Sequence, residues 1–376
     1  MTLTRYCWVG DLAALQAYCA HANVTAAQVR EACALQIAAF AGQLEIARWL
    51  QLTFQLTALD ARSDDNYALR MACESGRLEV ARWLQQTFQL TILDAQAVDN
   101  YAIRLTCNKG HLEVARWLQQ TFQLTAADAR SMNNYALQLA CANGYLEVAR
   151  WLQQTFQLTT LDARAVNNCA LHLACENGYL EVARWLQQTF QLTAADARSD
   201  NNFALRWTCS NGHLETARWM QQTFQLTAAD ARTYNNDALH KACAQGHLEV
   251  ARWLQQTFQL TAADARADDN RAVHRACAYG HLKVLRWLQR TWGLPPDALA
   301  PIHTPRSATC TAYLSSLRAL CWSPRTHADF PLPSRRHALL LLLVYQRLTR
   351  GPSVPGALPL LPPELWHLLL SYLPAW

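Results

Sequence analysis

The sequence predicts an all-α fold of short helical repeats stacked as a solenoid. A tryptophan returns every 34 residues, at Trp49, Trp83, Trp117, Trp151, Trp185, Trp219, Trp253 and Trp287, and nearly the same phrase surrounds each one: Gly-x-Leu-Glu-Val-Ala-Arg-Trp-Leu-Gln-Gln-Thr-Phe-Gln-Leu-Thr. A fixed period of this length indicates that each unit buries its apolar face against its neighbours. All thirteen prolines lie at residue 295 or later. Because proline breaks helix interiors, its absence before residue 295 favours a continuous helical array.

Each repeat begins with a short first helix, as residues 66–99 illustrate. Asn66 is the expected N-cap, and Leu69, Ala72 and Cys73 follow at helical spacing. Gly76 should end this helix, since glycine readily adopts a left-handed conformation.

A second helix is expected from near Leu78. Val80, Trp83, Leu84 and Phe88 form one apolar stripe along it. The stripe predicts that the tryptophan column belongs to the structural core rather than to an exposed stacking surface.

A third, shorter helical segment should link one repeat to the next. Thr91-Ile92-Leu93-Asp94 has the pattern of a capping box. In this motif the side chains of the Thr and of the acidic residue each accept a hydrogen bond from the other's backbone N–H. We therefore expect a short helix there that runs towards the next repeat at Asn100.

The organisation along the chain follows from the period and the prolines. We expect a degenerate N-terminal capping repeat at 1–29, 34-residue repeats over 30–294, a proline-punctuated linker at 295–334 and a C-terminal helical module at 335–376. Together the repeats amount to about nine units.

Composition and charge exclude several classes of function. Residues 1–294 carry 26 Lys and Arg against 25 Asp and Glu, so no basic footprint for nucleic acid is expected. The longest apolar run, 338–345, is too short to cross a bilayer. No signal-peptide pattern opens the chain. We expect a soluble monomer in the cytoplasm or nucleus, bound to neither nucleic acid nor membrane.

Catalysis, cofactors and metal are not expected. Identical repeats supply the same group at every layer, whereas a catalytic site needs different groups that converge. Zinc needs four ligands at one point, but the Cys-x-x-x-His pairs are spread one per layer, at Cys107–His111, Cys209–His213, Cys243–His247 and Cys277–His281. The alternative, which we prefer, is that Cys fills a small core position and His ties the turn.

The phrase Ala170-Leu171-His172-Leu173-Ala174-Cys175-Glu176-Asn177-Gly178-Tyr179-Leu180-Glu181-Val182-Ala183 resembles the ankyrin repeat, and the likeness recurs over residues 30–290. Two features depart from that family. Tyr67-Ala68 stands where ankyrins prefer Thr-Pro, and Thr-Phe-Gln stands where they place a glycine after the second helix. The capping box falls where ankyrins form a β-turn finger, so partly helical fingers are expected.

The resemblance implies a non-catalytic scaffold that binds a protein partner, of unknown identity, on a concave surface lined by the first helices and fingers. The variable positions that match this surface are Tyr67, Arg70, Glu74, Tyr101, Arg104, Lys109, Tyr135, Gln138, His172, Phe203, Arg206, Asp237, His240, Arg271 and His274. Neutral drift after duplication is the alternative explanation of their variation.

The C-terminal tail supports a second hypothesis. From residue 361 it resembles the opening of an F-box, with candidate ligase-docking residues Leu361, Pro362, Glu364, Leu365, Leu369, Tyr372 and Leu373. Ankyrin arrays of giant viruses and poxviruses carry such ends, which implies a substrate adaptor that docks to a cullin–RING linker protein in the host cell.

Two other interpretations of the tail remain open. Segments 316–321 and 358–362 resemble the two halves of a SOCS box, which would also dock to a cullin–RING ligase. Alternatively, residues 335–350 and 364–373 form a helical hairpin that only caps the array.

Overall fold

The computed structural model describes residues 2–292 and is all-helical there, with no β-strand within that range. The chain divides into two compact units, Met1–Asp230 and Ala231–Trp376. The expected linker at 295–334, the expected C-terminal module at 335–376 and the F-box-like and SOCS-box-like segments lie outside the described residues.

The described residues form nine helix pairs, seven in the first unit and two in the second, in agreement with the predicted repeats. The first helix of each pair is α1 (Leu3–Val9), α4 (Ala34–Ala41), α7 (Ser63–Glu74), α10 (Ala97–Asn108), α13 (Ser131–Ala142), α16 (Ala165–Glu176), α19 (Ser199–Ser210), α22 (Thr233–Ala244) or α24 (Ala262–Ala278). The second helix is α2 (Leu12–His21), α5 (Leu44–Phe54), α8 (Leu78–Phe88), α11 (Leu112–Phe122), α14 (Leu146–Phe156), α17 (Leu180–Phe190), α20 (Leu214–Phe224), α23 (Leu248–Phe258) or α25 (Leu282–Trp292).

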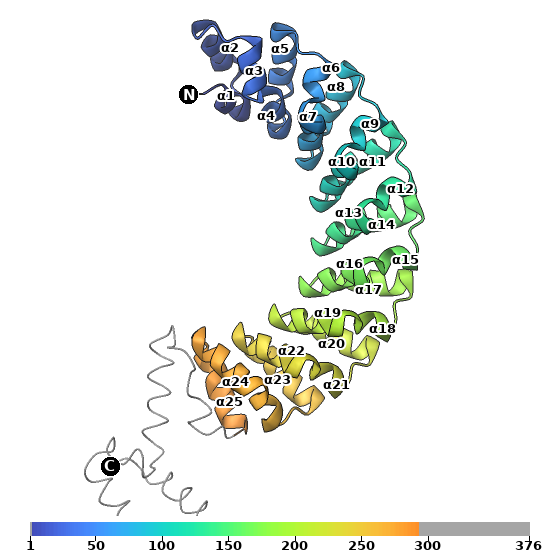
Figure 1. Cartoon of the computed structure of the whole chain (residues 1–376), viewed down its shortest axis with the longest axis vertical. Coiled ribbons are helices and arrows are strands. Elements are labelled where there is room, and N and C mark those ends of the chain that lie inside the picture. The colour runs from blue at the N-terminus through green and yellow to red at the C-terminus, as the bar shows by residue number, and fades with distance from the viewer. Residues whose placement is uncertain (1, 293–376) are drawn as a thin grey trace, which may run out of the picture. The chain divides into compact units, whose positions relative to one another are not determined.

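Short helices join the pairs: α3 (Ala26–Glu31), α6 (Ala58–Ala61), α9 (Ile92–Ala95), α12 (Ala126–Ala129), α15 (Thr160–Ala163), α18 (Ala194–Ala197) and α21 (Ala228–Ala231). Within the first unit, each first helix packs on the next, so that α7, α10, α13 and α16 lie side by side (Figure 1).

The predicted boundaries of the helix pair are confirmed. Gly76 has a φ of 72° and separates the first helix from α8, which begins at Leu78. The amide of Arg77 closes this turn by donating to the Ala72 carbonyl at 2.8 Å, which satisfies a carbonyl at the helix end.

The fingers are helical, and the predicted capping box holds them. In α9, the carboxylate of Asp94 accepts from the backbone N–H of Thr91 at 2.7 Å and from its hydroxyl at 3.1 Å. The arrangement recurs in the other four-residue helices α6, α12, α15, α18 and α21. A four-residue helix cannot be stable alone, so these reciprocal bonds and packing on the neighbouring repeats maintain it.

The predicted N-cap role of Asn66 is wrong. Asp64, Asp65 and Asn66 all have positive φ, of 50°, 55° and 63°, and form a left-handed turn before the regular part of α7. The Oδ1 atom of Asn66 is buried and accepts no hydrogen bond from the residues that the structure describes, so it caps no backbone N–H. The same three-residue turn precedes the regular part of α10, α13, α16, α19, α22 and α24. Left-handed conformations cost L-residues about 1–2 kcal/mol each, so the surrounding packing must impose them.

The core runs along the inner sides of the helix pairs. Leu69, Cys73, Leu84 and Phe88 are all buried. Burial raises the pKa of the Cys73 thiol, which keeps the thiol protonated and unreactive. The eleven cysteines within residues 2–292 form no disulfide.

The tryptophan column lies at the boundary of this core. Trp151 and Trp253 are buried, and the other six are half-buried. Each ring packs edge-on against the aromatic ring five residues later, as Trp151 does against Phe156 at 5.5 Å and 79°. Such pairs stabilise a fold beyond the area that they bury.

None of the helices within residues 2–292 is both long and apolar enough to cross a membrane.

Candidate functional site

Aromatic and arginine side chains alternate across three consecutive first helices of the first unit. The Arg70 guanidinium lies between two rings, 5.3 Å from the Tyr67 centroid and 4.9 Å from that of Tyr101. Arg104 lies in the same way between Tyr101 at 5.4 Å and Tyr135 at 5.6 Å. Cation–π contacts of this length are attractive. We call Tyr67, Arg70, Tyr101, Arg104 and Tyr135 the aromatic ladder.

The arginines of the ladder are fixed by the left-handed turns. Arg70 donates from Nε to the Asp65 carbonyl at 2.8 Å and from a terminal nitrogen to the Asp64 carbonyl at 2.7 Å. Arg104 makes the equivalent pair of bonds to Asp99 and Val98, both at 2.8 Å. These bonds tie each guanidinium to the backbone of the turn in its own repeat. The arginines therefore stabilise their own repeat and position the tyrosine rings.

Later repeats of the first unit use other side chains at the arginine position. Gln138 donates to the Asn133 carbonyl at 2.7 Å. His172 forms a hydrogen bond of 2.9 Å with the hydroxyl of Ser199 in the next repeat. Arg206 returns to the arginine pattern and donates to Asn201 and Asp200. The residue at this position thus varies with the hydrogen-bond partners that the turn and the next repeat provide.

His240 is the exception, in the second unit. It is 2% exposed, and neither ring nitrogen has a hydrogen-bond partner among the residues that the structure describes. In the next repeat Ala267 occupies the register that Ser199 holds after His172. Desolvation lowers the pKa of His240 to about 4, so the imidazole is neutral at pH 7.

Burial divides the predicted partner-binding residues into two groups. Arg104, Gln138, His172, Asp237 and His240 are buried, which the sequence analysis did not anticipate. The others retain exposed surface: Tyr67, Tyr135 and Lys109 are exposed, and Arg70, Glu74, Tyr101, Phe203, Arg206, Arg271 and His274 are half-buried.

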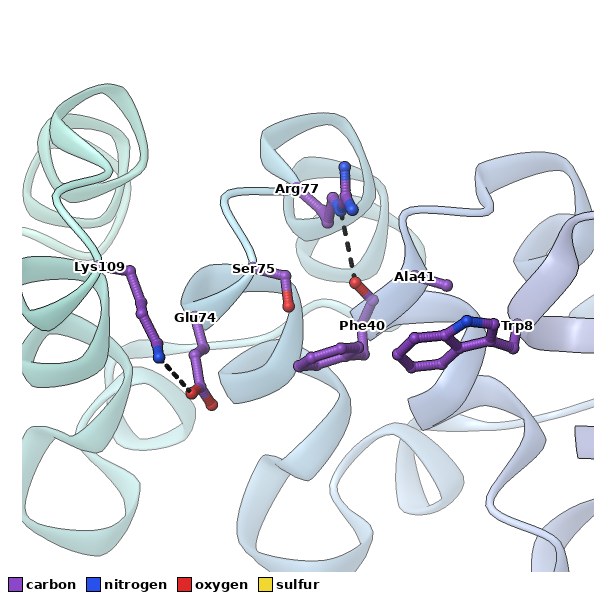
Figure 2. A pocket seen from close by; sticks show the side chains of 7 residues that line it. All are labelled: Trp8, Phe40, Ala41, Glu74, Ser75, Arg77 and Lys109. Atoms are coloured by element: carbon purple, nitrogen blue, oxygen red, sulfur yellow. Dashed lines mark hydrogen bonds and ion pairs between the residues drawn. The ribbon is translucent and has the colours of Figure 1, made fainter.

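A shallow groove of about 470 Å³ lies at the C-terminal ends of the first helices, where Trp8, Phe40, Ser75, Arg77 and Lys109 contribute to its lining. Figure 2 shows the rings of Trp8 and Phe40 at one side and an ion pair at the other. The two rings stack at 5.4 Å and 23°, although Trp8 is 55% exposed. Lys109 pairs with Glu74 at 3.8 Å. The sequence analysis identified Glu74 and Lys109 but missed Trp8, whose exposure no periodicity reveals.

The histidines and tyrosines after each helix-ending glycine cover the glycine of the preceding repeat. A Cβ at Gly76 would lie 2.7 Å from the His111 ring, and one at Gly144 would lie 2.5 Å from the Tyr179 ring. His111 therefore packs between repeats rather than with Cys107 around a metal. No group of three His, Cys, Asp or Glu that could hold a metal ion occurs within residues 2–292.

Comparison with known families agrees with this architecture. Residues 171–264 and 220–293 match the family model described as Ankyrin repeats (3 copies). The helix pairs form an array of the ankyrin type. No curated protein matches the chain in sequence.

The similarity to ankyrin repeats indicates which kind of site the array carries. Ankyrin arrays are typically non-catalytic modules that bind other proteins. In this ankyrin array the fingers are helical and the turn before each first helix is left-handed. In the first unit the polar side chains behind the turns are engaged within the fold, as Arg104 and Gln138 are, whereas the groove and the rings of Tyr67 and Tyr135 are exposed.

Proposed function

We propose that the protein is a non-catalytic scaffold that binds a partner protein on the exposed face of its first helices. The observation that carries the proposal is the fixed position of the exposed rings. Tyr67 and Tyr135 are 38% and 39% exposed, and guanidinium groups anchored to the backbone hold both. Rigid aromatic side chains lose little entropy on binding and dominate many interfaces.

The position of the groove supports the proposal that this face binds a partner. Tyr67 and Glu74 are seven residues apart on α7, so they lie on one side of the helix, two turns apart. The aromatic ladder and the groove thus occupy opposite ends of the same helix face. A partner that covers both would contact tyrosines at one end, and Trp8 with the Lys109–Glu74 pair at the other.

The test is capture of partners by the full chain and by a Tyr67→Ser/Tyr135→Ser/Trp8→Ser variant, followed by cross-linking mass spectrometry. Removing the exposed rings should abolish capture of at least one partner while the melting curve changes little. A Glu147→Ala/Glu181→Ala variant is the matched control, because both residues are exposed on second helices. If the serine variant captures the same partners as the parent, with cross-links elsewhere, the proposed face is wrong.

A second proposal concerns residues outside the described range. The resemblance of residues 361–373 to an F-box opening favours a substrate adaptor for a cullin–RING ubiquitin ligase. The full chain should then capture a cullin-linker protein, whereas a chain that ends at Pro296 should not. Equal recovery from both chains, or recovery from neither, would reject the adaptor function and leave the scaffold.

A further inference from the structure

The first residue of the left-handed turn is apolar and exposed in three consecutive repeats. Val98, Met132 and Val166 begin the turns before the regular parts of α10, α13 and α16, and they are 42%, 53% and 56% exposed. We call these three residues the apolar edge. α10 packs on α13, and α13 on α16 (Figure 1). The three residues therefore stand at equivalent positions of adjacent repeats.

The fold itself does not require apolar residues at this position. Asp64 and Asp200 begin the equivalent turns of the flanking repeats with φ of 50° and 49°, against 53° for Val98. A β-branched residue is a genuine outlier in the left-handed region, whereas Asp is several-fold enriched there. Aspartate would also remove an exposed apolar surface. The apolar edge therefore destabilises the isolated array in two ways. It places apolar side chains at left-handed backbone positions, and it exposes them to water.

Acidic residues surround the apolar edge. Asp64 and Asp65 are exposed at one end, Asp200 is exposed at the other, and Asp99 follows Val98 directly. The guanidinium of Arg104 bonds to the carbonyls of Val98 and Asp99 and is buried, so it is not presented at the surface beside the edge. A partner that buries the edge must therefore bring apolar side chains in the middle and positive charge at its ends.

The spacing of the layers indicates which secondary structure of a partner would fit the edge. Packed helix layers lie about 8–10 Å apart, and seven residues of an α-helix span about 10.5 Å with the side chains returned to one face. An α-helix with apolar residues at i, i+7 and i+14 therefore matches the edge.

We propose that the apolar edge binds a basic amphipathic α-helix of a partner protein. This inference rests on the proposed scaffold function and specifies one of its interfaces. It predicts contact with the turns, beside the aromatic ladder.

The decisive variant is Val98→Asp/Met132→Asp/Val166→Asp, because each substitution installs the residue that the chain already uses in the flanking turns. The probe is a fluorescent helical peptide of about three heptads with leucines seven residues apart and lysines at both ends, titrated with the full chain in an anisotropy assay. Binding should weaken at least about tenfold in the variant. Its melting temperature should stay the same or rise, which excludes unfolding as the cause.

Two controls make the test specific. Leu93→Asp/Leu161→Asp changes leucines that are 75% and 79% exposed on the short helices α9 and α15 and are not part of the edge, and should bind the peptide like the parent. A peptide with glutamates in place of the terminal lysines should bind at least about tenfold more weakly than the lysine peptide.

Three results would overturn the inference: equal binding by the parent and the triple variant, no peptide binding by the parent, or sedimentation that shows a dimer of the parent and a monomer of the triple variant. The last result would identify a second copy of the chain as the occupant. Partners captured through Tyr67 and Tyr135 would remain bound to the triple variant in each case, so failure of this inference is distinguishable from failure of the scaffold function.

Discussion

Arg130 and Asp162 join two consecutive repeats through a bidentate ion pair. Nε of Arg130 donates to Oδ1 of Asp162 at 2.7 Å, and a terminal nitrogen donates to Oδ2 at 3.0 Å. The same carboxylate accepts two hydrogen bonds from Thr159 in its own capping box. The pair recurs as Arg30–Asp60, Arg62–Asp94, Arg164–Asp196 and Arg198–Asp230 in the first unit and as Arg232–Asp264 in the second. The pairs thus attach the short helices α6, α9, α15, α18 and α21 to the repeat before each of them.

We expect Asp162→Ala to lower the free energy of unfolding by about 2 kcal/mol, since it removes a cap worth about 1 kcal/mol and a charge-assisted pair. The Arg130 side chain is 39% exposed, so water screens part of the attraction. Urea unfolding, with hydrogen exchange to locate the loss in α15, measures the effect. A change below about 0.5 kcal/mol would mean that packing alone holds the short helix.

The chain contains its own control for the Arg–Asp pairs. Gln96 replaces the arginine before Asp128 and donates to its Oδ1 at 2.7 Å. Gln96→Arg should restore the bidentate pair and raise the urea midpoint by the equivalent of about 0.5–1 kcal/mol. An unchanged or lower midpoint would show that the charge adds nothing to the hydrogen bond.

The Arg–Asp pairs should make the free energy of unfolding depend on pH. Desolvation raises the pKa of Asp162, but the hydrogen bonds from Arg130 and Thr159 outweigh it and lower the pKa to about 2. The unfolded value is about 3.9, so the stabilisation is complete above that pH and is lost as the pH falls towards 2. Urea midpoints of the parent and of Asp162→Asn should therefore converge between pH 5 and 2. A constant difference over that range would contradict the assignment.

A hydroxyl at residue 267 should stabilise the second unit. Ala267→Ser places at the Ser199 register the group that His172 uses in the first unit, and it offers His240 a partner. Satisfying a buried polar group should raise the free energy of unfolding by about 1 kcal/mol. Hydrogen exchange in α22 and α24 and the 15N shifts of the His240 ring would report the bond.

The matched variant is Ser199→Ala, which should destabilise the first unit by about the same amount. If Ala267→Ser leaves the imidazole shifts unchanged, then His240 does not reach the new hydroxyl.

The tryptophan column can be tested at its most enclosed member of the first unit. Trp151 is 9% exposed and packs edge-on against Phe156. Trp151→Ala should cost about 3–5 kcal/mol, the range for large aromatic truncations. Because repeats couple to their neighbours, exchange should accelerate first in α13, α14 and the adjacent pairs. Melting and exchange like those of the parent would show that the ring contributes little to the core.

The sequence by itself determined the local structure of each repeat. The 34-residue period fixes the helix pair, Gly76 ends its first helix, Leu78 begins the second, and Thr91 with Asp94 forms the capping box. The helix ends and the capping box depend on residues fewer than about ten positions apart, and their hydrogen bonds follow from local spacing.

Only the tertiary structure decided which side chains face a neighbouring repeat. The Arg130 and Asp162 columns are visible in the sequence, but 32 residues separate the partners, and no periodicity shows that they meet. Arg104 and His172 lie on the face that the sequence marks as variable, and yet they are buried. The left-handed turns direct these side chains back into the fold. Such turns are held by contacts between layers, which helical spacing cannot describe.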